Sequence, residues 1–155
     1  MLLIVYYDDG PRRKAKVGVM GQPKERYETD AGTSRRMSAV RPLDTTPEKI
    51  VQRILRSFGY RYGLHRYDLP GRPDIVLASR RKAIFVHGCF WHRHPGCHRT
   101  TMPKRNERLW QEKFRRTLER DQQKQRLLEE TGWQVLVVWE CETADEDCLA
   151  EVVQR

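Results

Sequence analysis

The chain has 155 residues, and its 30 Lys and Arg side chains outnumber its 21 Asp and Glu side chains, giving a formal net charge of +9. This length corresponds to about one domain, and a hydrophobic content of 38% excludes a chain that is disordered throughout. The sequence lacks the ~18 consecutive apolar residues of a membrane span, and we expect no signal peptide because Asp8 and Asp9 directly follow the apolar start. The basic excess favours an anionic partner, most commonly nucleic acid.

Residues 1–32 are predicted to form a mobile basic arm, followed by one folded domain over residues 33–155. A basic run at residues 12–16 has no apolar periodicity, and residues that interrupt helices and strands surround it: Pro11, Gly18, Gly21 and Pro23. An alternative is that the functional chain begins later, at Met20 or Met37. Arg35 and Arg36 follow the arm and are candidates for phosphate contacts.

A helix is predicted to begin at Thr45-Thr46-Pro47-Glu48, which combines a hydroxyl cap, a proline in the first turn and an acidic residue. Apolar residues then recur at helical spacing as far as Phe58, and Gly59 ends the helix. Turns rich in proline, glycine and polar residues separate the strands that follow. We predict these strands over residues 60–69, 74–78 and 83–86.

The second half of the chain is predicted to contain a long polar loop, a long helix and a strand. The loop covers residues 89–106, and the helix runs from about residue 106 to residue 130, with Gly132 closing it. The nearly continuous apolar run at residues 133–139 is typical of a central strand that is covered on both faces. This order of elements predicts an α/β fold, with a mixed β-sheet flanked by helices.

Two cysteines and three histidines lie within residues 89–98, and Cys141 follows the last predicted strand. Thiolate and imidazole are the preferred ligands of tetrahedral Zn²⁺, and a polar loop of this length needs such a clamp because it cannot bury enough of its own surface. One ligand set is Cys89, His94, Cys97 and Cys141, although the spacing also allows His98 in place of His94. The alternative is a group of unrelated surface histidines and buried cysteines. Cys148 is expected to be a free thiol.

Asp74 opens an otherwise apolar strand, where a carboxylate must be solvated, paired or bound to a cation. The next strand is predicted to run antiparallel and to end at His87, so that its end lies beside Asp74. One carboxylate and one neighbouring backbone carbonyl form half of a site for Mg²⁺, which keeps several of its waters. The alternative for Asp74 is a turn or cap residue. Glu48 lies at the margin of the first helix's apolar face, and a site role for it is as plausible as a capping role.

Asp121 falls within the apolar stripe of the long helix, which indicates a partner on the inward side, such as His87 or a metal-bound water. Otherwise Asp121 pairs with Lys124 or Gln125 in solvent. His92 lies in the loop that the metal would clamp, which is a good device for holding an imidazole rigidly. These acids and imidazoles would form a hydrated Mg²⁺ site that suits hydrolysis of a phosphodiester.

Large aromatic side chains lie within and next to the predicted metal-binding loop. Phe90 and Trp91 are adjacent, and Trp110 opens the long helix. Such side chains on a basic surface can insert between base pairs, where mismatched steps are the least costly to open. The alternative is that they pack over the metal site. Basic residues that are candidates for phosphate contacts surround them: Arg93, Arg99, Lys104, Arg105, Arg108, Lys113, Arg115 and Arg116.

Several motifs, in this order, resemble the very-short-patch repair (Vsr) endonuclease family. They are Leu69-Pro-Gly-Arg-Pro-Asp74, Ile84-Phe-Val-His-Gly-Cys-Phe-Trp-His92, Pro103-Lys-x-Asn106, Leu118-Glu-Arg-Asp121, Gly132-Trp133 and Val138-Trp-Glu-Cys141. The resemblance spans roughly residues 33–141. It implies a fold like that of restriction endonucleases, a structural zinc, and Mg²⁺-dependent nicking of double-stranded DNA 5′ to the T of a T:G mismatch left by deamination of 5-methylcytosine.

The resemblance also implies roles for individual residues. The residues that match the family's magnesium site are Asp74, the backbone carbonyl of Val86, His87, Asp121 and the outer acid Glu48. His92 matches the imidazole close to the scissile phosphate. The matching zinc ligands are Cys89, His94, Cys97 and Cys141. The residues that match the intercalating set are Phe90, Trp91 and Trp110, with Met37 matching one that inserts from the minor groove.

The sequence therefore predicts a DNA mismatch nicking endonuclease with a catalytic Mg²⁺ and a structural Zn²⁺. We expect a cytoplasmic, nucleoid-associated monomer, with mismatch-repair proteins as potential partners. One alternative is a restriction-type or broader-specificity DNA nuclease. The other is a non-catalytic zinc module that binds DNA by shape, which would have no use for Asp74, His87 and His92 together.

Overall fold

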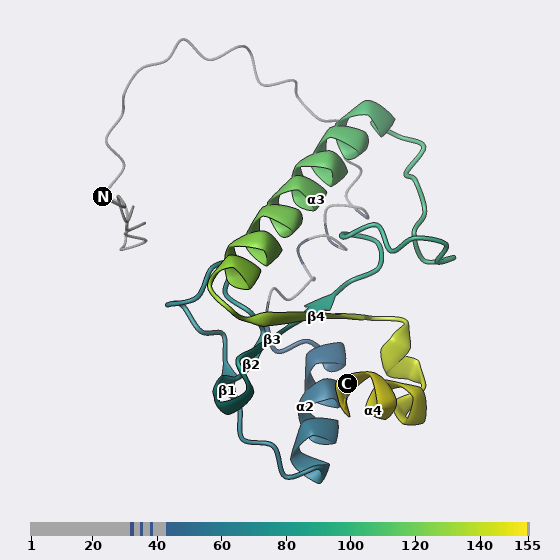
Figure 1. Cartoon of the computed structure of the whole chain (residues 1–155). Coiled ribbons are helices and arrows are strands. Elements are labelled where there is room, and N and C mark those ends of the chain that lie inside the picture. Colours follow the sequence, from purple (N-terminus) through teal and green to yellow (C-terminus); the bar gives the residue numbers. More distant parts are fainter. Residues whose placement is uncertain (1–31, 33–34, 36–37, 39–42, 155) are drawn as a thin grey trace, which may run out of the picture.

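A mixed sheet lies at the centre of the computed structural model, which describes residues 32, 35, 38 and 43–154 (Figure 1). Residues 1–31 of the predicted arm, together with Arg36 and Met37, lie outside the described residues. The strands are β1 (Gly63–Leu64), β2 (Ile75–Leu77), β3 (Lys82–His87) and β4 (Gln134–Trp139), and they lie side by side in that order. β2 pairs antiparallel with both β1 and β3, whereas β4 pairs parallel with β3. The predicted α/β fold with a mixed sheet is confirmed.

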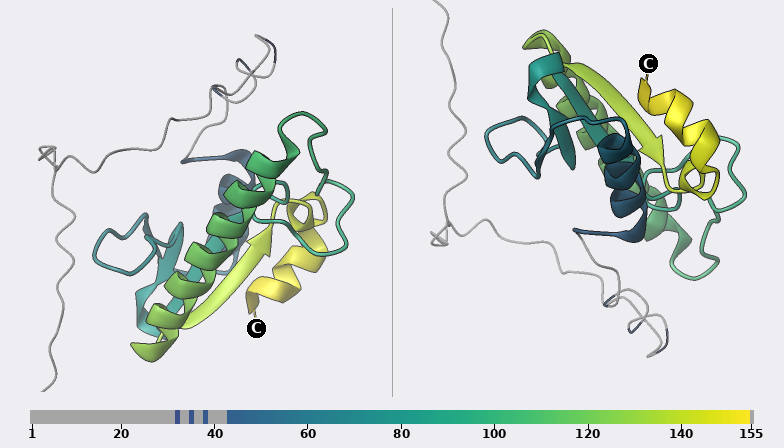
Figure 2. Two further views of the ribbon diagram at one scale, coloured as in Figure 1. Left: turned by 90° about the horizontal axis from the view of Figure 1, so that it is seen from above. Right: turned by 90° about the horizontal axis from the view of Figure 1, so that it is seen from below.

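Helices cover both faces of this sheet (Figure 2). The long helix α3 (Glu107–Glu130) lies on one face, while α2 (Thr46–Ser57) and α4 (Glu146–Gln154) contact each other on the opposite face. Side chains alternate along β3, so that Ile84 joins the core under α2 and α4 whereas Ala83 and Phe85 pack with Leu128 of α3. None of the helices in the described part of the chain has the length and apolar composition needed to cross a bilayer.

The structure confirms the predicted start of α2 and both ends of α3. The Thr45 hydroxyl accepts a hydrogen bond from the backbone N–H of Glu48, and Pro47 lies in the first turn. Helix α3 begins one residue after the predicted start, and Gly132 follows it with a φ of +80°. Two 3₁₀ turns, η1 (Ala78–Arg80) and η2 (Glu142–Ala144), complete the order of elements.

Two strand predictions are wrong in part. The strand expected over residues 60–69 is reduced to Gly63–Leu64, because the next residue, His65, has a φ of +47° and the chain then turns. The run at residues 133–139 forms β4, which lies at the edge of the described sheet and not in its centre. It is apolar because Val138 packs in the α2–α4 core and Val135 packs near α3, so both of its faces are covered.

Two adjacent leucines of α3 test how much this packing stabilises the fold. Leu128 is fully buried, whereas 42% of Leu127 is exposed. We expect Leu128→Ala to lower the free energy of unfolding by about 3 kcal/mol, because it removes apolar contact and leaves a cavity. Leu127→Ala, the matched control, should cost less than about 1 kcal/mol. Urea denaturation measures both, and equal costs would contradict the described packing of α3 on the sheet.

Candidate active site and metal cluster

A cleft of about 800 Å³ opens where the start of α2, the 71–74 turn, the end of β3 and α3 meet. Its walls bring together residues that are far apart in the sequence. All five acids and imidazoles predicted to take part in phosphodiester hydrolysis line it: Glu48, Asp74, His87, His92 and Asp121. The structure therefore assembles the predicted constellation in one place.

Asp74 is a largely buried carboxylate with one fixed hydrogen bond. Its Oδ2 accepts from the backbone N–H of Val86 at 2.8 Å, which confirms that the end of β3 lies beside it. Burial raises the pKa of Asp74 to about 6, and the neighbouring Glu48 acts in the same direction. The Val86 hydrogen bond and the imidazoles of His65 and His92 oppose this rise. Because the anion is costly here, a cation next to Asp74 would be favourable.

In an extended strand the N–H and the C=O of one residue point to the same side, and the N–H of Val86 points to Asp74. The register that pairs Ile75 with Ile84 places Val86 opposite Pro73, which has no amide hydrogen to donate. The Asp74 carboxylate takes the N–H of Val86 in place of a backbone acceptor. This geometry directs the Val86 carbonyl toward the Asp74 side of β3, and carbonyl and carboxylate oxygens are the hard ligands that Mg²⁺ prefers.

His87 and His92 stack on each other, with ring centroids 3.8 Å apart and planes 11° from parallel. Burial lowers the pKa of His87 to about 4, and the neighbouring His92 adds to this effect. The Nδ1 of His92 lies 2.5 Å from the Oδ2 of Asp121. Burial, the largest single effect, would raise the pKa of Asp121, but the hydrogen bond with His92 and the positive charges of His92, His87 and Lys124 together lower it.

The partner of Asp121 is therefore His92, and neither His87 nor a residue in solvent. The predicted inward orientation of Asp121 is confirmed, but the expected pairing with His87 is wrong, because the loop brings the His92 ring between His87 and α3. A carboxylate on Nδ1 orients the imidazole and favours the tautomer with its proton there. The other nitrogen, Nε2, is then the one that can exchange protons in the cleft.

Glu48 caps its own helix and lines the cleft at the same time. Its carboxylate accepts from the hydroxyl of Thr45 at 2.7 Å and from the backbone N–H of Asp44 at 3.0 Å, and the residue is 3% exposed. The carboxylates of Asp44 and Glu48 also lie within 4.8 Å of a ring nitrogen of His65. The capping alternative is thus present, and it fixes the acid in position at the cleft wall.

Cys89, His94, Cys97 and Cys141 converge on one point. Their ligand atoms all lie within 4.8 Å of one another, and the His94 Nδ1 lies 3.2 Å from the Cys141 Sγ and 3.8 Å from the Cys89 Sγ. These distances suit four ligands placed about 2.0–2.3 Å from a shared ion. His98 does not belong to this group among the described residues, and Cys148 is an exposed free thiol as predicted. The cluster could bind zinc.

The thiols of this cluster favour a cation for an electrostatic reason. Burial raises the pKa of Cys141 to about 12 and also raises that of Cys89. A backbone hydrogen bond at Arg99 lowers the pKa of Cys97 instead. Three sulfurs this close together cannot all be thiolates unless a positive ion compensates their charge. The donor set therefore fits a bound metal better than it fits three free thiols.

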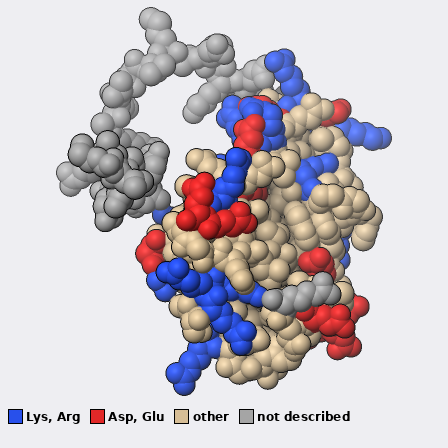
Figure 3. Space-filling model, viewed as in Figure 1, with Lys and Arg blue, Asp and Glu red and all other residues tan. Residues whose placement is uncertain are grey.

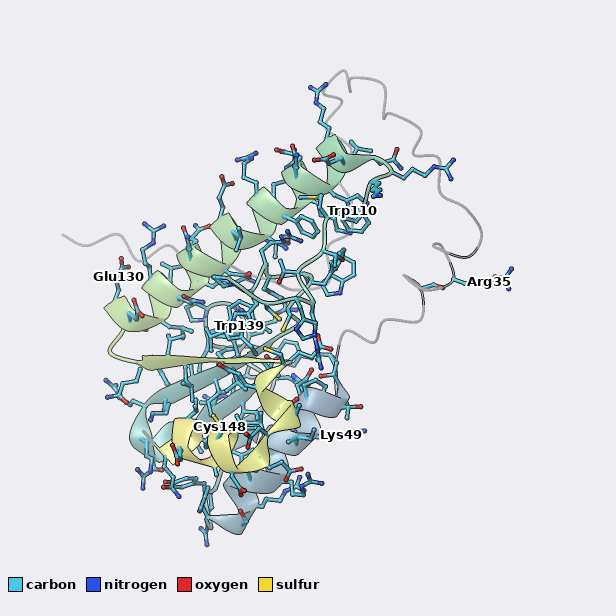
Figure 4. The ribbon with its side chains drawn as sticks, turned by 90° about the vertical axis from the view of Figure 1, so that its right-hand side faces the viewer. Arg35, Lys49, Trp110, Glu130, Trp139 and Cys148 are labelled. Carbon is cyan, nitrogen blue, oxygen red and sulfur yellow. The ribbon has the colours of Figure 1, made fainter. Side chains whose placement is uncertain are left out.

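Trp139, which the sequence analysis did not assign to the site, connects the cluster to the cleft. Its ring stacks on His94, with centroids 4.2 Å apart, and meets the edge of His87 at 5.5 Å. Figure 4 shows it on the α3 side of β4. Its position follows from the pairing of His87 with Trp139 across β3 and β4, a register that the sequence does not reveal.

The predicted wedge residues pack against each other and against Phe114. Phe90 meets Trp91, Trp110 and Phe114 edge-on, with centroids 5.2–5.5 Å apart. The Nζ of Lys113 lies over Trp91 at 4.7 Å and over Trp110 at 5.0 Å. Figure 4 shows Trp110 at the start of α3. The three wedge residues remain partly exposed, so their faces are not sealed in the core.

The predicted phosphate-contacting residues are not equally free to bind phosphate. On the face shown in Figure 3, acidic side chains lie between groups of basic ones. Arg115 and Arg116 on α3 both pair with Glu112, so their charges are already partly neutralised. Lys104 is exposed, and Arg35 is exposed and projects away from the sheet (Figure 4).

Lys124 and Glu140 are among the charged residues of the cleft wall that the sequence analysis did not assign to the site. Lys124 appeared only as an alternative partner of Asp121, yet its position three residues later places both on one face of α3 and in the cleft. Glu140 lies just before Cys141, and its backbone N–H donates to the carbonyl of His87. A helical wheel could have found Lys124, whereas Glu140 depends on the strand register.

Comparison with known proteins agrees with this geometry. Residues 27–99 match the model of a family described as DNA mismatch endonuclease Vsr. The type II nicking enzyme V.XorIIP of Xanthomonas oryzae pv. oryzae is 51% identical over 70% of this chain and 79% of its own. The DNA mismatch endonuclease Vsr of Escherichia coli K12 is 40% identical over 72% of this chain and 70% of its own.

A solved structure extends the comparison to the fold. The catalytic domain of the homing endonuclease I-Bth0305I superposes with a TM-score of 0.50, at 23% sequence identity, over 72% of this chain and 92% of its own. That likeness supports a restriction-endonuclease-like fold. Each of the two sequence relatives aligns with this chain over more than two thirds of the relative's own length. The protein therefore belongs to the Vsr family of DNA mismatch endonucleases.

Proposed function

We propose that the protein nicks double-stranded DNA 5′ to the T of T:G mismatches that arise from deaminated 5-methylcytosine. The observation that carries this proposal is the single cleft in which a buried carboxylate, Asp74, lies near an imidazole–carboxylate pair, His92 and Asp121. Relatives named as a mismatch endonuclease and as a nicking enzyme support the choice of substrate and of strand cleavage.

Different residues of the cleft have different roles in the proposed hydrolysis. Asp74 and the Val86 carbonyl would hold Mg²⁺, which when bound neutralises charge on the phosphoryl oxygens. His92, with its Nδ1 held by Asp121, exchanges a proton through Nε2. His87 stays neutral at pH 7 because its pKa is about 4, and it stacks against His92 to fix that ring. Glu48 acts from the outer edge.

The remaining predicted residues serve binding and rigidity in this proposal. Zn²⁺ at Cys89, His94, Cys97 and Cys141 would hold the loop, while Phe90, Trp91 and Trp110 open the duplex next to the mismatch. Phosphate contacts would come from basic residues such as Lys104, Arg35 and Arg36, with Met37 entering from the minor groove. Residues 1–32 would add a basic arm. We propose a cytoplasmic monomer that acts with mismatch-repair proteins.

Nicking of matched and mismatched duplexes tests this function directly. With Mg²⁺, we expect cleavage of one strand of a T:G duplex and little cleavage of the matched duplex. Asp74→Asn should lower the nicking rate by at least about 1,000-fold, because it removes the negative charge that would hold the ion. DNA affinity should change little. Asp68→Asn, at an exposed acid paired with Arg66, is the control and should nick normally. Equal cleavage of matched and T:G duplexes would instead favour a broader DNA nuclease.

The raised pKa of Asp74 predicts how nicking depends on pH. At low Mg²⁺ the nicking rate should rise as the pH passes about 6, because the ion competes with the proton for this carboxylate. More Mg²⁺ should move the midpoint to lower pH. A rate profile whose midpoint does not respond to the Mg²⁺ concentration would rule out competition at Asp74.

The same shift predicts a change in stability without Mg²⁺. The folded protein holds the Asp74 proton more tightly than the unfolded chain, so this group stabilises the fold below about pH 4, and that contribution is lost as the pH rises through about 6. Thermal unfolding without added Mg²⁺ should therefore show Asp74→Asn to be at least as stable as the wild type at pH 7.5.

Paired cysteine variants test the metal cluster. Cys89→Ser should release zinc and lower the melting temperature, because one ligand of the buried cluster is lost. Cys148→Ser, at an exposed thiol outside the cluster, should keep both the metal and the stability. Elemental analysis and thermal unfolding measure these effects. A wild-type protein purified without metal and folded normally would show that the cluster is not a zinc site.

A further inference from the structure

A half-buried lysine of α3 faces the cleft. Lys124 lies three residues after Asp121, on the same face of the helix, and lines the cleft with Asp74, His87 and His92. Its positive charge lowers the pKa of both Asp121 and His87, which means that the ammonium group lies within electrostatic reach of both. The lysine is therefore part of the wall that would surround a bound phosphate.

The aliphatic part of Lys124 is held by the turn that presents Asp74. A Cβ placed on Gly71 would lie 2.9 Å from the Cβ of Lys124 and 3.0 Å from its Cγ and Cδ. The absence of a side chain on Gly71, whose φ is +78°, is what lets the lysine stem lie across this turn. A packed stem loses little further conformational freedom when its ammonium group binds a ligand.

The ammonium group of Lys124 has no ion-pair partner within the described part of the chain. The acid closest to it along the helix, Asp121, already bonds His92 at 2.5 Å. The other cations of the cleft differ from Lys124: Lys49 is exposed, and the Arg72 guanidinium lies over the ring of Tyr67 at 4.9 Å. Lys124 is thus the half-buried cation on the same wall as the His92–Asp121 pair.

We propose that Lys124 is a catalytic residue that binds a non-bridging oxygen of the scissile phosphate, an inference that rests on the proposed nuclease function. In hydrolysis the oxygen of water bonds to phosphorus, one P–O ester bond breaks, and the leaving oxygen gains a proton. The non-bridging oxygens carry negative charge throughout this step. A fixed cation beside them stabilises the transition state at no reorganisation cost. The end of β3 that reaches the cleft is Phe85-Val86-His87 and carries no lysine or arginine, since Lys82 lies at the other end of the strand.

Substitutions at Lys124 separate this role from a structural one. Lys124→Met should lower the single-turnover nicking rate on the T:G duplex by roughly 100-fold, the effect typical of losing one charge-stabilising donor in an active site. DNA affinity without Mg²⁺ should change by less than about 3-fold, a far smaller effect than the loss of rate. Lys124→Arg should retain more activity than Lys124→Met. Arg126→Met removes the same charge from an exposed position of α3 and is the matched control, with an unchanged rate.

Chemical rescue provides the sharper readout. Lys124→Ala leaves the space above Gly71 open, so ethylammonium should restore part of its nicking rate, whereas tetramethylammonium at equal concentration should not. An unchanged rate in Lys124→Met, or a loss explained by weaker DNA binding or by a shifted pH midpoint, would overturn the proposal. Absence of rescue in a folded Lys124→Ala would also count against it. A wild type that does not nick T:G duplexes would instead refute the proposed function, so the two failures are distinguishable.

Discussion

The parallel pairing of β3 with β4 is the constraint on which both the candidate active site and the Cys–His cluster depend. It sets His87 level with Trp139, and the chain then continues two residues from each to reach Cys89 and Cys141. Parallel strands that end at the same edge bring their following residues together, so cysteines 52 positions apart become neighbours. The same register places Trp139 between the cluster and the imidazole of His87. A shift of this register would therefore disturb the cluster and the cleft together.

Burial shifts the pKa values of two cleft residues in opposite directions, and these shifts set the protonation states of the site. It raises the pKa of the Asp74 carboxyl and lowers that of His87, so that in each group it shifts the equilibrium toward the neutral form. Asp121 differs because its hydrogen bond to His92 and the neighbouring positive charges together outweigh burial and lower its pKa. One carboxylate thus needs an external positive charge whereas the other is already satisfied. This division supports the proposal that Asp74, and not Asp121, holds the metal.

Local patterns predicted what local interactions determine. The cap at Thr45 and the ends of α3 depend on neighbouring residues, and the sequence shows them directly. The Cys and His set was also predictable because few other chemistries place so many donors in one loop. The position of β4 in the sheet was not predictable. An apolar run indicates that both faces of a strand are covered, but it does not indicate which strands lie beside it. The partner of Asp121 depends on the path of a loop with no periodicity, and only the folded chain brings His92 to it.

In the proposed function, the short segment from Cys89 to His92 links mismatch recognition to strand cleavage. A metal-cluster residue, two wedge residues and the proton-exchanging imidazole are consecutive from Cys89 to His92. Backbone hydrogen bonds from His92 to Gly88 and from His94 to Cys89, both 3.1 Å long, hold this segment in a tight turn. Rings that enter the duplex from such a turn cannot move far without moving His92. A duplex that resists opening would therefore keep its phosphate away from the imidazole. Mismatched steps are easier to unstack than matched ones, so they would be favoured in the cleavage step as well as in binding.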